Sequence, residues 1–441
     1  MTTHHTHDTG ERADALVMFG LTGDLGDKKL FPALAELVAA GELDLPLVSV
    51  SRSELGPDEI RSRILDALDD AGAERARAVA NELDVRSVSG GVDDDATWAD
   101  IAEHLDGCDR PVVYAALPPD LFGTLAARVA SSDLPDTARL VIEKPLGHDE
   151  ASARELWDDI TSRIDPERVF VVDHFLAKTA IENLLTVRTC NAVIANNLRP
   201  GTVRRIDVVM HETGGVDGRG SFYESVGAVR DVVQNHVLQL LALATMDAPA
   251  DGSDEAYLAA RQDLLASIRP VDPARVVLGQ YVGYRDLDDV DDDSDVETYA
   301  SLEVAIDQDP WRGVPVHLVT GKQLHEQRTA VVFTVQSDDA GGAGACGRLA
   351  FDVSPSPCIS IDLDVLDGDG HTTRTITLAG RPDDDHGGLG DSATMLRGAL
   401  VGERRHFATI DGILAGWRVV DPIARARPEV RRYEPGAAGP S

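Results

Sequence analysis

An Asp-His pair precedes a lysine in the segment VVDHFLAKTA, residues 171–180. The three side chains are Asp173, His174 and Lys178. An ammonium group is a compact point charge that suits a phosphate or a hydroxyl group, whereas a guanidinium is a planar fork. Lysine is rare in this chain, so each lysine that remains is a candidate for such a contact. The alternative is chance survival in a lysine-poor composition. The lysines are Lys28, Lys29, Lys144, Lys178 and Lys322.

A histidine lies inside the helix-like segment GAVRDVVQNHVLQLLALATMD, residues 227–247. The neighbours of His236 at helical spacing are apolar, which is typical of a histidine in the core. Polar residues such as Asp231 and Asn235 also interrupt this helix, and they suit the wall of a polar pocket. A carboxylate that fixes the imidazole tautomer makes a histidine a general base, and Asp173 is a candidate for that carboxylate. Both interpretations, core residue and base, stay open at this point.

A glycine turn follows the first apolar segment, residues 15–20, and opens into a helix. Glycine lets the backbone approach a pyrophosphate, and the N-terminus of the helix can then hold that group. The GxxGxxG spacing differs from GxGxxG, but the position after a first strand favours dinucleotide binding. The candidate cofactor-binding residues of this turn are Gly20, Leu21, Thr22, Gly23, Asp24, Leu25 and Gly26.

The second apolar segment, residues 45–51, indicates which cofactor is bound. An acidic residue near the end of this strand would accept hydrogen bonds from the ribose 2′-hydroxyl of NAD. Here the strand runs into Ser51-Arg52-Ser53 before any acid appears. The guanidinium of Arg52 can hold a 2′-phosphate through two N–H groups, which predicts NADP. The alternative is that Arg52 is a solvated loop residue and that Glu54 binds the ribose.

These residues need a scaffold, and the pattern of apolar segments predicts one. Strand-like segments up to VFVVDH, residues 169–174, alternate with helices such as 57–71 and 120–131, which indicates a parallel, doubly wound sheet. After residue 200 come a long helix over 224–247 and strand-like segments without helices between them. We predict a Rossmann-like cofactor domain over 12–175 and an α+β domain over 176–441. The second domain is expected to hold a large, mostly antiparallel sheet for substrate binding and oligomerisation.

The composition excludes several classes of function. The chain has 441 residues, of which 43% are hydrophobic, and a formal charge of −35, which repels nucleic acid and anionic membranes. It has no apolar run of membrane-spanning length and no signal peptide at its start, so we expect a cytoplasmic protein. The acidic run 286–297 lacks the turn glycine of an EF-hand, and the cysteines show no CxxC spacing, so no metal is expected.

Five blocks resemble the glucose-6-phosphate dehydrogenase family in their order and approximate spacing. The blocks are GLTGDLGDKKLFPAL, EKPLGHD, VVDHFLAK, GVDGRGSFYESVGAVRDVVQNHVLQLLAL and VPVHLVTGKQL. The ending YEPGAAGP is also similar to that family. The resemblance implies oxidation of the C1 hydroxyl of glucose 6-phosphate to the lactone, with the hydride passing to NADP⁺. It also implies a homo-oligomer, formed through the sheet of the second domain.

The resemblance assigns a role to each candidate residue. His236 matches the general base, and Asp173 matches the carboxylate that orients it. His174 and Lys178 match the phosphate contacts, and Lys144 lies between the sugar and the nicotinamide. Pro145, after Lys144, is where the family tends to carry a cis peptide. The remaining sugar-binding positions are Glu212, Asp231 and Lys322.

Two departures from the family pattern bear on the substrate. Phe175 replaces a tyrosine whose hydroxyl would reach the phosphate, and Ser354 stands where many members have a glutamine near the sugar. These changes permit a related sugar phosphate as the substrate. A second alternative is a protein that senses NADP(H) without turnover, although the retention of both Asp173 and His236 argues against it.

Overall fold

The computed structural model describes residues 12–53, 55–68, 73–199, 201–216, 218–336, 346–368, 373–381 and 388–440. The contacts between residues in space divide the chain into two compact units. The first unit holds the described residues up to 147, residues 151–178 and residues 388–409. The second holds residues 148–150, the described part of 179–381 and residues 410–440. Glu54, the alternative ribose ligand, lies outside the described residues. The domain boundary at 175 stays a prediction.

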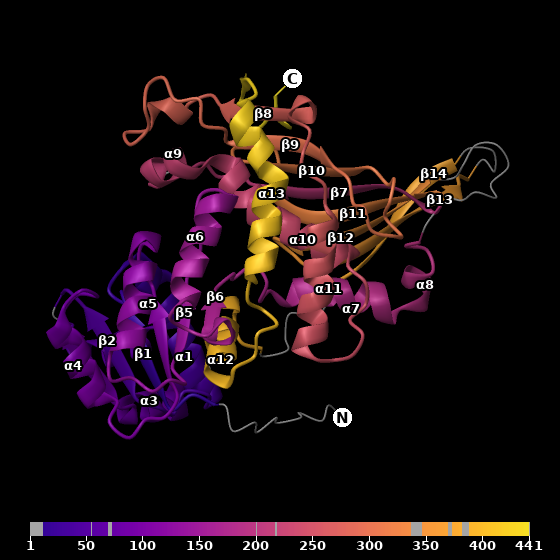
Figure 1. Ribbon diagram of the computed structural model, residues 1–441. Coiled ribbons are helices and arrows are strands. Elements are labelled where there is room, and N and C mark those ends of the chain that lie inside the picture. Colours follow the sequence, from indigo (N-terminus) through magenta and orange to yellow (C-terminus); the bar gives the residue numbers. More distant parts are fainter. Residues whose placement is uncertain are drawn as a thin grey trace. The chain divides into compact units, whose positions relative to one another are not determined.

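The first unit is built on a six-stranded parallel sheet in the order β3-β2-β1-β4-β5-β6 (Figure 1). This sheet confirms the doubly wound architecture that the sequence predicts. Every residue of β1, β2 and β4 is buried, because helices cover both faces of the central strands. The strands are β1 (Ala15–Phe19), β2 (Leu47–Ser51), β3 (Val85–Ser89), β4 (Pro111–Ala115), β5 (Arg139–Ile142) and β6 (Val169–Val171).

The helices of this unit connect successive strands. The first of them is helical from residue 24 to residue 40, and its beginning takes the wider π geometry. The helices are η1 (Gly26–Leu30), α1 (Phe31–Ala40), α2 (Pro57–Asp66), α3 (Ala73–Glu82), α4 (Asp95–His104), η3 (Pro119–Leu121), α5 (Phe122–Ser131), α6 (Glu150–Thr161) and η4 (Pro166–Arg168).

A late segment of the chain, residues 388–409, also belongs to the first unit. It contains helix α12 (Asp391–Val401), whose apolar side chains join the core cluster around β1. The Ala13 N–H donates a hydrogen bond to the Leu400 carbonyl at 2.7 Å, and the Ala408 N–H donates one to the Val171 carbonyl at 3.0 Å. The segment therefore contacts both the first and the last strand of the sheet.

The second unit is built on a nine-stranded sheet in the order β14-β13-β12-β11-β7-β10-β9-β8-β15. The β7–β10 and β8–β15 pairs are parallel and the other neighbours are antiparallel, which confirms a mostly antiparallel sheet. The strands are β7 (Val203–His211), β8 (Val276–Tyr281), β9 (Tyr299–Val304), β10 (Val316–Gly321), β11 (Arg328–Gln336), β12 (Cys346–Ser354), β13 (Cys358–Leu366), β14 (Thr373–Gly380) and β15 (Val430–Tyr433).

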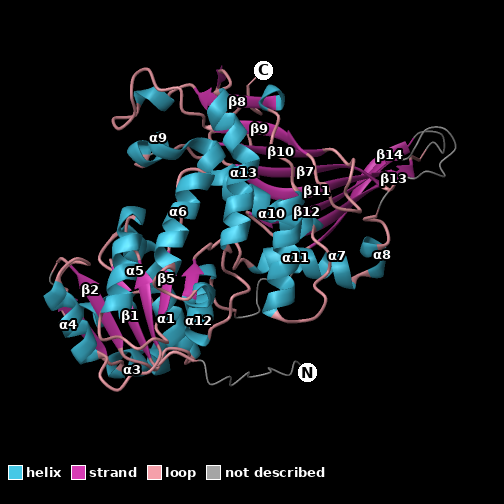
Figure 2. Ribbon diagram, viewed as in Figure 1, coloured by secondary structure: helices cyan, strands magenta, loops and turns pink. Residues whose placement is uncertain are grey.

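Helices cover one face of this sheet in two layers (Figure 2). The inner layer contacts β7, β9, β10 and β11, and the outer helices α11 and α13 pack on it. The inner layer consists of η5 (Val229–Val237) and α10 (Leu238–Thr245), and α9 (Gly220–Ala228) precedes η5 and contacts it. The other helices are α7 (Thr179–Cys190), α8 (Ala192–Ala195), α11 (Asp254–Ser267), η6 (Pro273–Arg275), η7 (Tyr284–Asp286) and α13 (Ile410–Ala426).

The sequence predicts one regular helix over 224–247, and the structure differs from this prediction in two ways. Gly227 has φ 65° and ψ 176°, which breaks the helical geometry at the end of α9. The following nine residues, η5, form a π-helix before regular α-helix resumes. Stretches of π-helix are rare in proteins, and those that do occur are often found at functional sites. Among the described residues, no helix combines the length and the apolar character that a bilayer crossing requires.

Candidate active site

The carboxyl ends of β5 and β6 bring two predicted residues together. The strands pair in parallel, with Ile142 opposite Val171, so the residues that follow them emerge at the same edge of the sheet. The Lys144 Nζ lies 2.8 Å from the Asp173 Oδ2, and this carboxylate is buried. The Phe175 N–H donates to the Asp173 Oδ1 at 3.1 Å, which fixes the carboxylate at its other oxygen. The Lys144–Pro145 peptide is cis, as the family resemblance leads us to expect.

The two predicted phosphate contacts lie just beyond this pair, and each has a polar neighbour. The Lys178 Nζ lies 2.9 Å from the Asp391 Oδ2, at the first residue of α12. The His174 Nδ1 lies 3.2 Å from the Ser392 Oγ, and its Nε2 lies 3.4 Å from the Glu143 Oε1. The sequence did not indicate Asp391 or Ser392. The Asp-Ser start of an apolar helix is visible as a helix N-terminus, but nothing in the sequence places it beside Lys178.

A buried tyrosine holds the carboxylate that faces His174. The Tyr114 Oη donates to the Glu143 Oε1 at 2.5 Å. Burial, and then the charge of Glu143, raises the pKa of Tyr114 well above its ordinary value, so the phenol stays a donor. Among the described residues, the buried Nε2 of His174 and Nζ of Lys144 have no hydrogen-bond partner at good geometry. Both groups nevertheless face a carboxylate, because the Lys144 Nζ lies 2.8 Å from the Asp173 Oδ2 and the His174 Nε2 lies 3.4 Å from the Glu143 Oε1.

The glycine turn after β1 has the geometry that a dinucleotide needs. Gly20 has φ 79°, and a Cβ there would lie 2.2 Å from the Ala116 carbonyl oxygen. A Cβ on Gly26 would lie 1.9 Å from the Leu21 carbonyl oxygen, so both positions require glycine. A Cβ on Gly23 would meet only the Gly20 carbonyl oxygen, at 3.4 Å, so this turn is open to an approaching ligand. The first turn of the helix also leaves N–H groups without partners inside the helix. The residues of the turn therefore fit a pyrophosphate.

Arg52 lies at the same sheet edge as this turn. Strands β1 and β2 are parallel neighbours, and the Gly20 N–H donates to the Val50 carbonyl at 3.2 Å. Arg52 directly follows β2 and its side chain is exposed. The Ser51 Oγ donates to the Ser53 carbonyl at 2.5 Å and closes the turn around it. In the part of the chain that the structure describes, Arg52 has no carboxylate partner, so its guanidinium is available to a ligand.

In the second unit, two predicted sugar-binding residues form a half-buried ion pair. Strands β7 and β10 are parallel, with His211 opposite Gly321, so Glu212 and Lys322 follow at the same edge. The Lys322 Nζ lies 2.5 Å from the Glu212 Oε1 and 5.9 Å from the centre of the Tyr223 ring. Lys322 is buried, whereas the Glu212 side chain is 32% exposed, so solvent reaches the pair from the carboxylate side.

Tyr223 is a residue of this group that the sequence analysis missed. Burial raises the pKa of Tyr223 well above its ordinary value, and the charges of Asp231, Glu297 and Glu212 add to the effect. Its hydroxyl is buried without a hydrogen-bond partner among the described residues. The only signal in the sequence is a tyrosine in the glycine-rich block before the helix, and an apolar core position would give the same signal.

His236 and Asp231 lie on the π-helical segment η5. Both are half-buried, whereas Val232, Val233 and Val237 on the same segment are buried. The Asn235 Oδ1 accepts a hydrogen bond from the His236 N–H. The polar residues therefore share the less buried side of η5, which supports a pocket wall over a core histidine.

The two departures from the family pattern lie in different units. Phe175 is buried in the first unit and carries no hydroxyl. Ser354 ends β12 in the second unit, where it pairs with Thr329 of β11. Among the described residues, no group of three His, Cys, Asp or Glu side chains is arranged to hold a metal ion.

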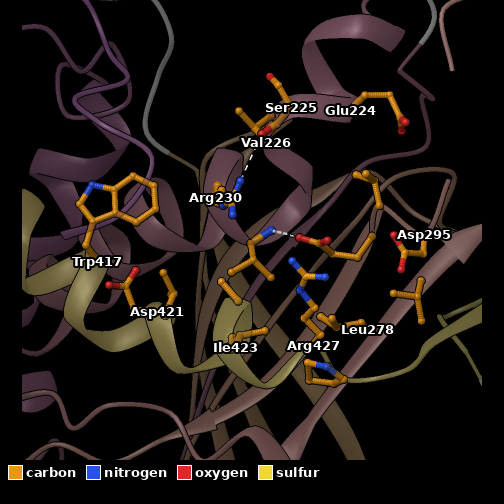
Figure 3. Close-up of a pocket in the computed structure, with 17 residues that line it drawn as sticks. Glu224, Ser225, Val226, Arg230, Leu278, Asp295, Trp417, Asp421, Ile423 and Arg427 are labelled. Carbon is orange, nitrogen blue, oxygen red and sulfur yellow. Dashed lines mark hydrogen bonds between the residues drawn. The ribbon is translucent and has the colours of Figure 1, made fainter. Parts of the chain in front are cut away.

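A cavity of about 350 Å³ lies on the second unit between the start of η5, residues 295–297 before β9 and the end of α13 (Figure 3). It is lined by none of the predicted site residues. The half-buried Glu297 forms part of its wall, and its Oε1 accepts a hydrogen bond from the Val229 N–H at 3.0 Å. Burial raises the pKa of Glu297. This carboxylate holds the first residue of the helix segment that carries His236.

Comparisons with known proteins cover nearly the whole chain. Residues 17–183 match the family described as glucose-6-phosphate dehydrogenase, NAD binding domain, and residues 185–441 match the C-terminal domain of the same enzyme. Glucose-6-phosphate 1-dehydrogenase 1 of Mycobacterium tuberculosis is 33% identical over 98% of this chain and 94% of its own length.

Two solved structures are similar to the fold. The glucose-6-phosphate 1-dehydrogenase of Mycobacterium avium superposes with a TM-score of 0.88 at 33% identity, over 97% of this chain and 95% of the other. A glucose-6-phosphate dehydrogenase in complex with its substrate glucose 6-phosphate gives a TM-score of 0.89 at 25% identity, over 98% of this chain and 96% of the other.

Proposed function

Since this chain belongs to the glucose-6-phosphate dehydrogenase family, we propose that it oxidises C1 of glucose 6-phosphate to the lactone and passes the hydride to NADP⁺. The observation that carries the proposal is the set of basic groups at the β5–β6 edge. Lys144, His174 and Lys178 gather there in a chain whose formal charge is −35. An acidic protein that binds a phosphate needs cationic donors at the binding place, and these groups supply them, each beside a carboxylate.

The cofactor would be held by the first unit. The match to an NAD binding domain supports a nicotinamide dinucleotide, and NADP⁺ is our proposal on the ground of Arg52. When bound, this cofactor supplies the acceptor for the hydride from C1. Arg52 is proposed to hold the 2′-phosphate, and Lys144 is proposed to lie near the nicotinamide. The pyrophosphate would lie against Gly20, Leu21, Thr22, Gly23, Asp24, Leu25 and Gly26.

The proposed base is His236. Its Nδ1 is a buried atom, so we assign the proton of the C1 hydroxyl to the other ring nitrogen, Nε2. Asp173 is proposed to orient the imidazole and to stabilise the positive charge that it gains. The contacts of Asp173 with Lys144 and the Phe175 N–H support this role, because a carboxylate held at both oxygens has one fixed orientation.

The remaining residues are proposed to bind the sugar phosphate. His174 and Lys178 would hold the phosphate, and Lys144 would lie between the sugar and the nicotinamide. Glu212, Asp231 and Lys322 would bind sugar hydroxyl groups. Hydrogen bonds to a charged group are stronger than those between neutral groups, and the Lys322–Glu212 pair offers a charged donor and a charged acceptor to the sugar.

One experiment tests the substrate and the cofactor together. Reduction of NADP⁺ and of NAD⁺ is measured with glucose 6-phosphate, a panel of other sugar phosphates and free glucose, at low and high salt. We expect the highest kcat/KM for glucose 6-phosphate with NADP⁺. A preference for another sugar phosphate would favour the alternative that Phe175 and Ser354 permit. Binding of NADP(H) without turnover of any substrate would favour a sensor.

We also propose a cytoplasmic homo-oligomer that joins through the sheet of the second unit. Strand β14 is at the edge of that sheet, where unpaired backbone groups are available to another chain. Leu363 on β13 and Leu378 on β14 are 42% and 55% exposed. The register places both on the same face of the hairpin. Exposed leucines beside an open strand edge support contact with a second copy.

A further inference from the structure

Two residues at the start of α12 contact the proposed phosphate-binding pair. Asp391 lies 2.9 Å from the Lys178 Nζ, and the Ser392 Oγ lies 3.2 Å from the His174 Nδ1. All four residues belong to the first unit. The side chains of Lys178 and Asp391 are 39% and 32% exposed, so a ligand from solution can reach the pair. The ammonium that would hold a phosphate is thus already held by a carboxylate.

We propose that Asp391 competes with the phosphate of the substrate for Lys178, and that it thereby sets how strongly the enzyme binds phosphate-bearing ligands. The inference rests on the proposed function, because it takes Lys178 as a phosphate contact. A phosphate dianion and the Asp391 carboxylate have the same sign, so they repel each other when both contact one ammonium. The phosphate must weaken or displace the internal ion pair before it gains the full attraction of Lys178.

The position of Asp391 explains how a carboxylate can stay at an anion site. It is the first residue of α12, where the helix N-terminus favours a negative charge. Two features therefore stabilise it, the helix end and Lys178. The pair keeps the ammonium ordered before the substrate arrives, and an uncharged sugar has no means of displacing the carboxylate. Asp391 is in this sense a specificity-determining residue.

Ser392 has the complementary task of positioning His174. When the Ser392 hydroxyl donates to Nδ1, the proton of the imidazole is on Nε2. That nitrogen lies 3.4 Å from the Glu143 Oε1 and has no hydrogen-bond partner at good geometry among the described residues. The N–H on Nε2 then faces the Glu143 carboxylate, and the Ser392 contact fixes which ring nitrogen carries the proton. The first turn of α12 therefore acts on both phosphate contacts, one by competition and one by orientation.

The test compares Asp391→Asn with the wild-type full chain. Binding of inorganic phosphate is measured by calorimetric titration, and KM and kcat are measured with glucose 6-phosphate at saturating NADP⁺. The matched control is Asp44→Asn. Asp44 is an exposed carboxylate of the same unit that lies 2.7 Å from the Arg12 guanidinium, so its loss removes the same charge outside the site. Asp391→Ser is a second variant in case the amide disturbs the start of the helix.

We expect Asp391→Asn to lower the Kd for phosphate and the KM for glucose 6-phosphate by a common factor of about two to five, the range of a partly exposed ion pair. The kcat should not change, and Asp44→Asn should alter neither constant. An unchanged or raised Kd for phosphate overturns the inference, even where the wild type turns over glucose 6-phosphate. If the wild type binds phosphate, with the expected gain in the variant, but has no turnover, the proposed function fails and the competition stands.

Discussion

At the scale of single residues, His236 provides the most direct test of the chemistry. It is half-buried on η5, beside the buried valines of the same segment. We expect His236→Asn to lower kcat by about 10²- to 10⁴-fold, the range for general acid–base catalysis, with little change in KM. His104→Asn is the control for replacing a histidine by asparagine, since His104 lies at the end of α4 and outside the site. Near-normal turnover of His236→Asn would show that His236 is only structural.

Lys178 is predicted to contribute a point charge to phosphate binding. Lys178→Ala should raise the KM for glucose 6-phosphate by about one to two decades, because a charge-assisted hydrogen bond to the phosphate is lost. Lys178→Arg should restore little, because the planar guanidinium needs a different geometry. The reaction with free glucose is the internal control. If the variant loses as much affinity for glucose as for glucose 6-phosphate, Lys178 does not contact the phosphate.

Arg52 is predicted to recognise the 2′-phosphate. It is exposed at the end of β2 and has no carboxylate partner among the described residues. Arg52→Ala should therefore raise the KM for NADP⁺ and leave the KM for NAD⁺ nearly unchanged. Both constants are measured on the same preparation with a saturating sugar phosphate. A wild type that prefers NAD⁺, or a variant that loses both cofactors equally, would contradict the assignment.

At the scale of elements, the break before η5 is predicted to position His236. Gly227 has a backbone conformation that is almost confined to glycine, and a Cβ there would lie 2.6 Å from the Glu297 Oε1. We expect Gly227→Ala to cost about 1–3 kcal/mol of stability and to lower kcat, because η5 must shift. Gly41→Ala is the control, since Gly41 has φ 72° and open space around it. Thermal unfolding and kcat that match those of Gly41→Ala would show that the Glu297 contact is unimportant.

The sequence predicted elements best where a single local pattern decides them. Strands β1, β4 and β5 are apolar runs between turn signals, and the structure confirms them. The segment VRSVS of β3 was not predicted, because this edge strand is only partly buried and its polar residues give no apolar run. The π geometry of η5 was missed because a pattern of apolar residues does not distinguish a helix from a slightly wider one.

The candidate site was predictable only in part, for a related reason. Lys144 and Asp173 follow neighbouring parallel strands, so strand order alone brings them to one edge. Asp391 and Ser392 reach Lys178 and His174 through tertiary packing of a distant segment, which leaves no local signal. The buried hydroxyl of Tyr223 shows the same limit, since the sequence does not tell which core positions face charged groups.

At the scale of the whole molecule, the exposed leucines of the β13–β14 hairpin predict an oligomer. Leu378→Asp should convert the assembly to a smaller species in light scattering, because a charge at an apolar interface is costly. Val193→Asp is the control, since Val193 on α8 is 76% exposed and lies outside the sheet. An unchanged mass for Leu378→Asp would place the interface elsewhere, and a monomeric wild type would contradict the proposal.

The place of residues 388–409 in the first unit affects how the protein can mature on the ribosome. Domains usually fold as units while the chain emerges, with the N-terminal one first. Here the N-terminal sheet lacks part of its core until Met395, Leu396 and Phe407 have been translated, because these side chains pack with the cluster around β1. The first unit therefore cannot complete its core, and keeps apolar surface exposed, until nearly the entire chain has been synthesised. A premature stop codon in the last part of the gene would thus damage the core of the N-terminal unit as well as that of the C-terminal one.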